Sequence, residues 1–177
     1  MHVTLLTAQS LDGFITRHDE PGSGFTSAED KAHFRATLAD FDCCVMGGAT
    51  YRGAREWIQT HVAAPRRLGV VLPRTPERHA AETRPGALEF TGAPPEKILA
   101  GLRARGFARC ALLGGAQVHG LFLAAGLVDE LWLTVEPVLF GGGTPLLAGR
   151  VDVRLELMTL EKLNPAGTLL LRYRVVR

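Results

Sequence analysis

The chain has 177 residues, of which 46% are hydrophobic and 21% are charged, as in an ordinary globular protein. Its formal net charge is +2, with the basic residues scattered along the sequence, so neither nucleic acid nor a membrane surface is an expected partner. We expect no signal sequence, because residues 1–4 show no basic segment followed by an apolar core, and no apolar run reaches the length of a membrane span. We therefore expect residues 1–177 to form one domain in the cytoplasm.

The three cysteines are Cys43, Cys44 and Cys110. An odd number with two adjacent members does not indicate a disulfide framework, and the apolar sequence around the first two predicts buried, reduced thiols. The sequence contains neither CxxC nor HExxH. We therefore expect no metal site.

The first half of the chain alternates strands and helices. The predicted elements are a strand at 3–8, a loop at 16–24, a helix after Ser27, strands at 42–46 and 68–72 with a helix at 49–58 between them, and a short strand at 87–90. Ser27 is a favourable N-cap, and acidic Asp30 lies in the first turn of its helix. Phe34, Leu38 and Phe41 recur at helical spacing and predict its buried face.

The second half continues this alternation and then changes. The predicted elements are a helix from Pro95 with Ile98, Leu99 and Leu102 buried, a strand at 109–113, a helix with Val118, Leu121, Phe122 and Ala125 on its buried stripe, and strands at 130–138, 154–163 and 168–176. The last two strands are joined by the turn sequence NPAG at 164–167. This order predicts an α/β fold in which a mostly parallel central sheet is flanked by helices and ends in an antiparallel C-terminal edge.

Two segments, 45–50 and 112–117, share one design in which a buried strand runs into a Gly-Gly pair and then a helix. A helix N-terminus carries free N–H groups and a partial positive charge, and glycine lets a phosphate approach the backbone closely. The two turns could therefore hold a cofactor that contains a pyrophosphate. Tight strand-to-helix turns with no ligand are the alternative, because neither segment is a GxGxxG or P-loop motif.

Five segments, taken in order, are similar to the dihydrofolate-reductase-like superfamily. The segment TAQSLDG at 7–13 resembles the opening of the C-terminal reductase domain of the bifunctional riboflavin-biosynthesis deaminase–reductase. MGGATY at 46–51 is similar to a turn of dihydrofolate reductase. LGGAQV at 113–118, GLVDEL at 126–131 and FGGGTPL at 140–146 resemble the closing half of both families.

The resemblance implies bound NADPH and hydride transfer to a C=N or C=O carbon of a small pterin-like or pyrimidine-like heterocycle. Of the cofactor residues carried over by position, Ala8 and Ile15 would face the nicotinamide, and Arg74 and Thr75 would hold the 2′-phosphate. The full cofactor set comprises Ala8, Ile15, Gly47, Gly48, Thr50, Tyr51, Leu72, Arg74, Thr75, Gly114, Gly115, Ala116 and Gln117.

Asp30 and Thr134 match the substrate-binding carboxylate of dihydrofolate reductase and the threonine that supports it. The resemblance implies that their side chains lie within hydrogen-bond reach and that shielding from water raises the pKa of Asp30. An acid can hold a ring N–H together with a neighbouring amino group. The alternative is that Asp30 is a solvated charge in the first turn of its helix.

Two positions depart from the riboflavin-pathway reductases. Leu113 stands where they carry a glutamate, and Leu6 stands where they carry a lysine, so polar groups for a phosphorylated ribosyl substrate are missing. Three alternatives to a reductase of unassigned substrate stay open: the riboflavin-pathway 5-amino-6-(5-phosphoribosylamino)uracil reductase, dihydrofolate reductase, and a non-catalytic nucleotide-binding sensor. The apolar strands at 131–138 and 168–176 also predict a sheet edge that is covered in a homodimer.

Overall fold

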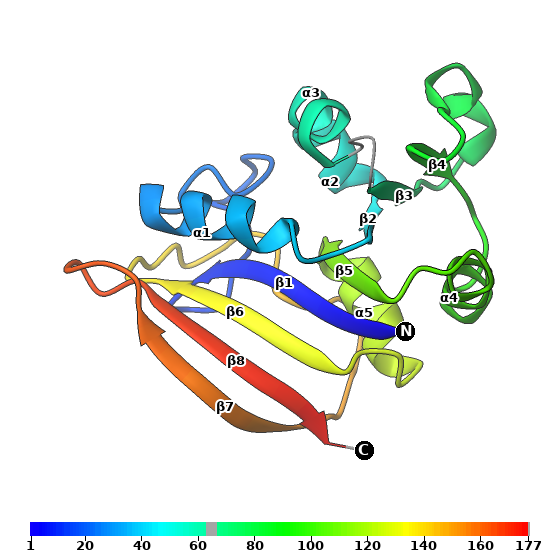
Figure 1. Ribbon diagram of the computed structural model, residues 1–177. Helices are drawn as coiled ribbons and strands as arrows, with labels where there is room; N and C mark the ends of the chain where they lie inside the picture. Colours follow the sequence, from blue (N-terminus) through cyan, green and yellow to red (C-terminus); the bar gives the residue numbers. More distant parts are fainter. Residues whose placement is uncertain (63–66, 177) are drawn as a thin grey trace.

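The computed structural model describes residues 1–62 and 67–176 and shows one mixed β-sheet flanked by helices (Figure 1). The strands are β1 (His2–Ser10), β2 (Cys43–Gly47), β3 (Leu68–Leu72), β4 (Leu88–Phe90), β5 (Arg109–Gly114), β6 (Glu130–Glu136), β7 (Arg154–Lys162) and β8 (Leu169–Val176). The helices are α1 (Ala28–Leu38), α2 (Gly48–Gly53), α3 (Arg55–Trp57), α4 (Pro95–Ala104) and α5 (Ala116–Ala124), with a π-helical turn η1 (Ile58–Val62) and a 3-10 helix η2 (Pro76–Glu82).

The sheet has the strand order β4-β3-β2-β5-β1-β6-β8-β7. The first six strands in this order are parallel, whereas β8 and β7 are antiparallel to their neighbours. The predicted fold class is therefore confirmed. The structure differs from the prediction in one detail. β6 pairs in parallel with β1, so only β8 and β7 form the antiparallel edge. The helix α5 explains this, since it carries the chain back across the sheet before β6 begins.

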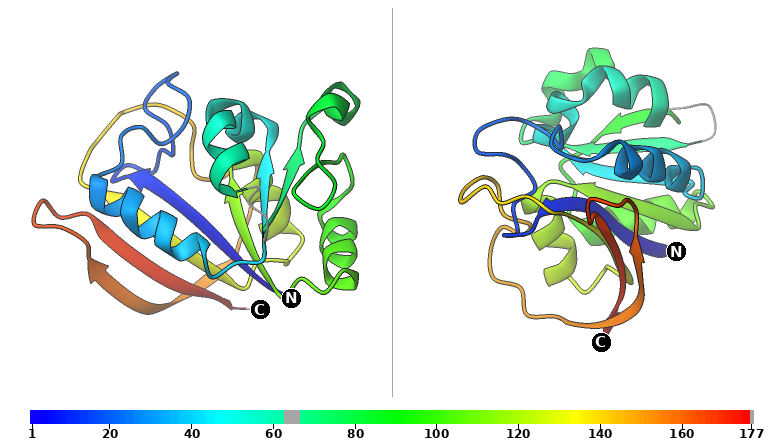
Figure 2. Two further views of the ribbon diagram at one scale, coloured as in Figure 1. Left: turned by 45° about the horizontal axis from the view of Figure 1, so that its top comes forward. Right: turned by 90° about the vertical axis from the view of Figure 1, so that its left-hand side faces the viewer.

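The inner strands of the sheet contribute alternate residues to two hydrophobic cores on opposite faces. On β1, Val3 and Leu5 pack on the side of α4 and α5, whereas Leu6 packs on the side of α1 and α2. Cys43 and Cys44 divide between the two faces in the same way. Figures 1 and 2 show α1 lying across the sheet over β1 and β6. Both faces are therefore covered, as a parallel sheet requires.

The first long helix begins where the sequence predicts. The Ser27 Oγ accepts a hydrogen bond from the Asp30 N–H at 3.2 Å, which makes Ser27 the N-cap of α1. The helix ends at Leu38, so Phe41 lies beyond it, although both side chains are buried. The predicted apolar face thus combines the last turn of the helix with the loop that follows.

Two predicted helices are partly wrong. The helix expected at 49–58 is broken into α2, α3 and η1, because Ala54, which follows Gly53, has a non-helical φ of −133°. In α5, Leu121 is 54% exposed and Ala125 is also exposed, so neither belongs to the core. The buried side of α5 is formed instead by Val118, His119, Phe122 and Leu123.

The three cysteines are buried and free, as predicted, and burial raises the pKa of Cys44 to about 12. Within residues 1–62 and 67–176, no group of three or more His, Cys, Asp or Glu side chains is arranged to hold a metal ion. None of the helices described is long and apolar enough to span a membrane.

Candidate functional site

A single large groove of about 1380 Å³ runs along the carboxyl ends of the parallel strands. Ala8, Gly47, Leu72 and Leu113 line it at or near the ends of β1, β2, β3 and β5. In open α/β sheets the carboxyl ends of the strands form the usual ligand crevice. The groove is large enough for two ligands side by side.

The two Gly-Gly turns lie next to each other at this edge, because β2 and β5 are neighbouring strands. A Cβ atom placed on Gly47 would lie 3.6 Å from the Gly114 carbonyl oxygen and 3.7 Å from the Gly115 nitrogen. A Cβ atom on Gly115 would lie 3.5 Å from the Thr50 Oγ1. The two glycine turns and the Thr50 hydroxyl therefore lie side by side at one edge of the sheet.

The backbone requires glycine at position 114 and leaves little room for a side chain at position 48. A Cβ atom on Gly48 would lie 3.0 Å from the Cα of Pro73, and one on Gly114 would collide with the His119 ring. Gly114 also has a φ of +89°, which side-chain-bearing residues rarely adopt. No side chain caps the N-terminus of α5 at Gly115. The first turn of α5, with Ala116 and Gln117, thus borders the groove with a partial positive charge.

Basic side chains gather where β3 ends. Leu72, Arg74 and Thr75 line the groove as predicted, together with Arg52 from α2 and His79 from η2. The His79 ring stacks on Phe90 at 4.7 Å, and its Nδ1 lies 2.9 Å from the Glu82 carboxylate. This end of the groove suits an anionic group.

Tyr51, a member of the predicted cofactor set, does not line the groove. The residue is 1% exposed, and its hydroxyl donates a hydrogen bond to Glu82 at 2.5 Å and accepts one from Gln59 at 2.7 Å. Its ring packs in the core on the α1 side of the sheet. Gly114 is likewise buried behind the turn, so it shapes the groove without lining it.

The loop that carries Ile15 is held in place by Asp12. The Asp12 carboxylate accepts hydrogen bonds from the Ser10 hydroxyl at 2.6 Å and from the Gly141 N–H at 2.7 Å. These bonds lower the pKa of Asp12. Ile15 thereby lies across from Gly115, and both it and Ala8 line the groove.

Asp30 and Thr134 meet at the other end of the groove, as predicted. Their side chains are hydrogen-bonded to each other, and Thr26 provides a second side-chain bond to Asp30. Asp30 is only 7% exposed, and this burial raises its pKa, although the two threonine bonds oppose the rise. The negative charge of Glu136 raises it further. Asp30 is therefore not a solvated helix charge.

Aromatic and apolar side chains surround this carboxylate. The rings of Phe34 and Trp57 lie 5.8 Å apart, and Trp132 also lines the groove. Sequence reasoning missed Trp132, although it precedes Thr134 by two residues on one strand and strand alternation places both on one face. Leu6 and Leu113, the two departures from the riboflavin-pathway reductases, also line the groove.

A mostly parallel sheet with an antiparallel edge and a groove across its strand ends defines the dihydrofolate-reductase-like class of folds. The structure matches dihydrofolate reductase from Enterococcus faecalis, complexed with NADP(H), with a TM-score of 0.66 and 19% identity over 99% of this chain and 97% of that one. Within this class, the family model of the RibD C-terminal domain matches residues 1–169. The chain therefore belongs to the RibD C-terminal domain family.

Two further solved structures share the fold. A pyrimidine reductase-like protein from Corynebacterium diphtheriae has a TM-score of 0.78 and 20% identity, over 99% of this chain and 92% of that one. A diaminohydroxyphosphoribosylaminopyrimidine deaminase/5-amino-6-(5-phosphoribosylamino)uracil reductase from Thermotoga maritima has a TM-score of 0.76 and 15% identity, over 99% of this chain but 56% of that one. A comparison with curated proteins finds no match.

Proposed function

We propose that the protein is an NADPH-dependent reductase that transfers a hydride to a C=N or C=O carbon of a small pterin-like or pyrimidine-like heterocycle. The observation that carries this proposal is the single groove, which joins the two glycine turns at one end to the buried Asp30–Thr134 pair at the other. The family and fold are those of reductases, and their chemistry needs the cofactor's hydride-donating carbon held against the acceptor carbon of the substrate.

The cofactor end fits NADPH in two respects. The missing Cβ atoms of Gly47 and Gly115 leave room for a pyrophosphate beside the Thr50 hydroxyl. Arg74 and Thr75 offer a charge and a hydroxyl for the 2′-phosphate. NADPH supplies the hydride when it is bound, and the chain's own part is to position it.

The substrate end fits a flat heterocycle that carries adjacent donors. The two oxygens of Asp30 can accept a ring N–H and a neighbouring amino group, while Thr134 and Thr26 fix the carboxylate in place. The apolar rings of Phe34 and Trp57 exclude water from the faces of such a ligand.

Two apolar residues that line the groove affect which substrates it can bind. Leu6 is 5% exposed, and both it and Leu113 present hydrocarbon to the groove where the riboflavin-pathway reductases carry charged groups. At these two positions a phosphorylated ribosyl group would find no charged partner. We therefore favour a heterocycle without a phosphate over the riboflavin-pathway intermediate.

NADPH oxidation against a panel of pterins and pyrimidines tests the proposal. Turnover with any member separates an enzyme from a nucleotide-binding sensor. Asp30→Asn should lower turnover by at least about 100-fold while leaving the Kd for NADPH unchanged, because the residue lies at the substrate end. Glu29→Gln, an exposed neighbour in the same helical turn, is the matched control and should behave as wild type. Full activity in Asp30→Asn would exclude the assigned role.

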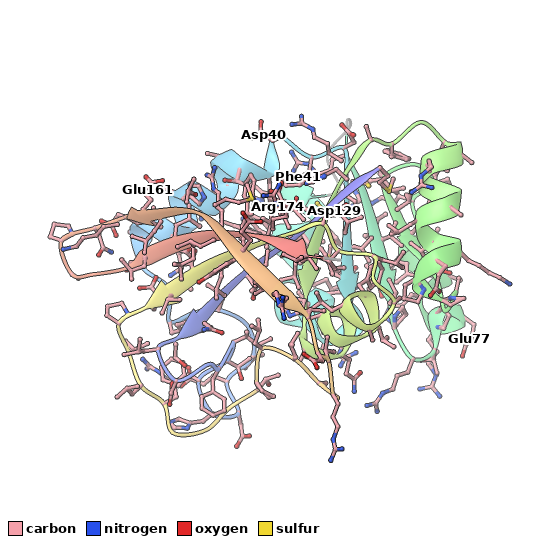
Figure 3. The ribbon with its side chains drawn as sticks, turned by 90° about the horizontal axis from the view of Figure 1, so that it is seen from below. Asp40, Phe41, Glu77, Asp129, Glu161 and Arg174 are labelled. Carbon is pink, nitrogen blue, oxygen red and sulfur yellow. The ribbon has the colours of Figure 1, made fainter. Side chains whose placement is uncertain are left out.

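We also propose that two subunits associate through the antiparallel edge. Figure 1 shows β7 as the outermost strand beside β8, and Figure 3 labels Glu161 near its end. Leu155, Leu157, Met158 and Leu160 of this strand are exposed. The edge predicted from 131–138 and 168–176 was misplaced, because β6 and β8 both have neighbours on either side. Exposed apolar residues on an unpaired edge favour coverage by a second copy.

A further inference from the structure

Glu136, at the end of β6, is a buried carboxylate with an unusual pair of partners. It is 4% exposed, and one of its oxygens accepts a hydrogen bond from the Ser27 backbone N–H at 2.7 Å. Its other oxygen accepts a hydrogen bond from the Thr168 hydroxyl at 2.6 Å. A buried carboxylate is retained only when such donors compensate its lost hydration.

The direction of the Thr168 bond follows from its other partner. The Asn164 side-chain nitrogen donates to the Thr168 oxygen at 2.9 Å, so the hydroxyl proton is available for Glu136. Asn164 itself is fixed, because its side-chain oxygen accepts the N–H groups of Gly167 and Thr168 in the turn between β7 and β8. Both oxygens of Glu136 therefore act as acceptors, which is the arrangement of an ionised carboxylate.

The other partner of Glu136 belongs to the start of α1. Ser27 is the N-cap of this helix, and its hydroxyl accepts the Asp30 N–H at 3.2 Å. Thr134 lies two residues before Glu136, so both point from β6 toward α1. One strand thus bonds the first turn of α1 twice, once through Glu136 to the Ser27 backbone and once through Thr134 to the Asp30 side chain.

We propose that Glu136 is a positioning residue of the substrate pocket: it fastens the first turn of α1 to β6 and to the β7–β8 turn, and thereby holds the Asp30 carboxylate beside Thr134. The role of Asp30 in this inference rests on the proposed function. The attachment of the first turn of α1 by Glu136 does not depend on it. The charge of Glu136 acts in the same direction as burial, since both raise the pKa of Asp30.

Three variants separate the effect of the Glu136 hydrogen bond to Ser27 from the effect of the Glu136 charge. Glu136→Gln keeps a carbonyl acceptor for the Ser27 N–H but removes the charge, whereas Glu136→Val removes both. Glu161→Gln, on the exposed strand β7, is the control for loss of a glutamate charge. For each protein, carbon-13 NMR measures the pKa of Asp30, and hydrogen exchange measures the protection of the Ser27 amide. Titrations measure the Kd values for NADPH and for 2,4-diaminopyrimidine, which offers adjacent ring and amino donors when it is protonated at a ring nitrogen.

In Glu136→Gln the pKa of Asp30 should fall. In Glu136→Val the Ser27 amide should exchange at least about tenfold faster, and 2,4-diaminopyrimidine should bind at least about tenfold more weakly, with Gln restoring most of that affinity. NADPH affinity should stay unchanged throughout.

An unchanged Asp30 pKa in Glu136→Gln, or unchanged Ser27 exchange in Glu136→Val, would overturn the proposal. If wild type fails to bind 2,4-diaminopyrimidine, the substrate role of Asp30 fails instead, while the NMR and exchange results still decide the role of Glu136.

Discussion

Asp30 illustrates how a functional residue differs from a structural one. Its place in the first turn of a helix is explained equally well by favourable interaction with the helix dipole, so the sequence pattern around it left two interpretations open. Only the resemblance connected it to Thr134, about a hundred residues away. The structure brings the two side chains together at a buried site, where burial raises the pKa of the carboxyl group. Such placement costs stability and is typical of functional sites.

Arg74 should determine the preference between the two nicotinamide cofactors. It lines the groove beside Thr75, where the 2′-phosphate of NADPH would lie and where NADH has only a hydroxyl. Arg74→Ala should therefore weaken NADPH binding by about 1 to 3 kcal/mol, the range for a charge-assisted hydrogen bond, and leave NADH binding nearly unchanged. A fluorescence titration with each cofactor measures this, and equal losses for both would refute the assignment.

His119 should make stability depend on pH. Its Nδ1 lies 2.9 Å from the Leu146 carbonyl oxygen, and its Nε2 has no hydrogen-bond partner among the described residues. Burial lowers the pKa of His119 from 6.5 to about 4. The unfolded chain therefore takes up a proton at a higher pH than the folded one, and stability is lost as pH falls through this interval.

The difference between the two pKa values of His119 corresponds to as much as about 3 kcal/mol. Urea unfolding at a series of pH values from 7 to 4 should show this loss in the wild type and much less of it in His119→Leu, which cannot be protonated. Parallel pH profiles for the two proteins would show that His119 is not the group responsible.

At the scale of elements, local signals predicted most of the sheet and the helix ends. The strand at 68–72 was predicted with its observed bounds, because five apolar residues stop at Pro73. The helix from Pro95 buries the three residues expected and ends before Gly106, whose φ is +86°. In each case the residues that determine the structure lie within the element itself.

Predictions failed where contacts distant in sequence decide the outcome. In α5, periodicity placed Leu121 in the core, but the face that meets the sheet is set by the turn at Gly115, and His119 lies inside instead. The break after Gly53 was also missed, because an isolated glycine inside a helical pattern is tolerated and does not by itself end a helix. Glu136 carries no local signal, since its partners come from two other elements.

The turn between β5 and α5 gives a direct test of the cofactor end. In Gly115→Ala the new methyl group would make ordinary contacts, at 3.5 Å from Thr50 Oγ1 and 3.8 Å from Ile15 Cδ1, so the fold should survive. The methyl group would nevertheless occupy the expected pyrophosphate path and weaken NADPH binding by at least about tenfold. Calorimetry measures the affinity. Gly101→Ala, in the exposed part of α4, is the control, and an equal affinity for both variants would contradict the assignment.

At the scale of the molecule, the order of strands was not predictable from the sequence. Apolar content pointed to 131–138 and 168–176 as the exposed edge, yet both strands lie inside the sheet. The edge is β7, whose residues are all exposed although several are apolar. Alternation of apolar and polar residues shows that a strand has two different faces, but it does not say which strand lies beside it.

The exposed edge predicts a dimer that charged residues should disrupt. Leu157 and Leu160 on β7 are 50% and 58% exposed. Light scattering at micromolar concentration should give twice the chain mass of 19.1 kDa for the wild type, and the chain mass itself after Leu157→Lys and Leu160→Lys are combined. Leu121→Lys, on the exposed side of α5, should remain dimeric. A monomeric wild type would refute the proposed association.

The central claim is that one groove holds NADPH and a heterocycle end to end, and a crystal structure of the protein grown with NADP⁺ tests it most directly. We predict the pyrophosphate between the turns at Gly47 and Gly115, the 2′-phosphate against Arg74, and the nicotinamide beside Ala8 with its edge toward Asp30. A cofactor bound elsewhere on the molecule, or no binding at millimolar concentration, would contradict the account.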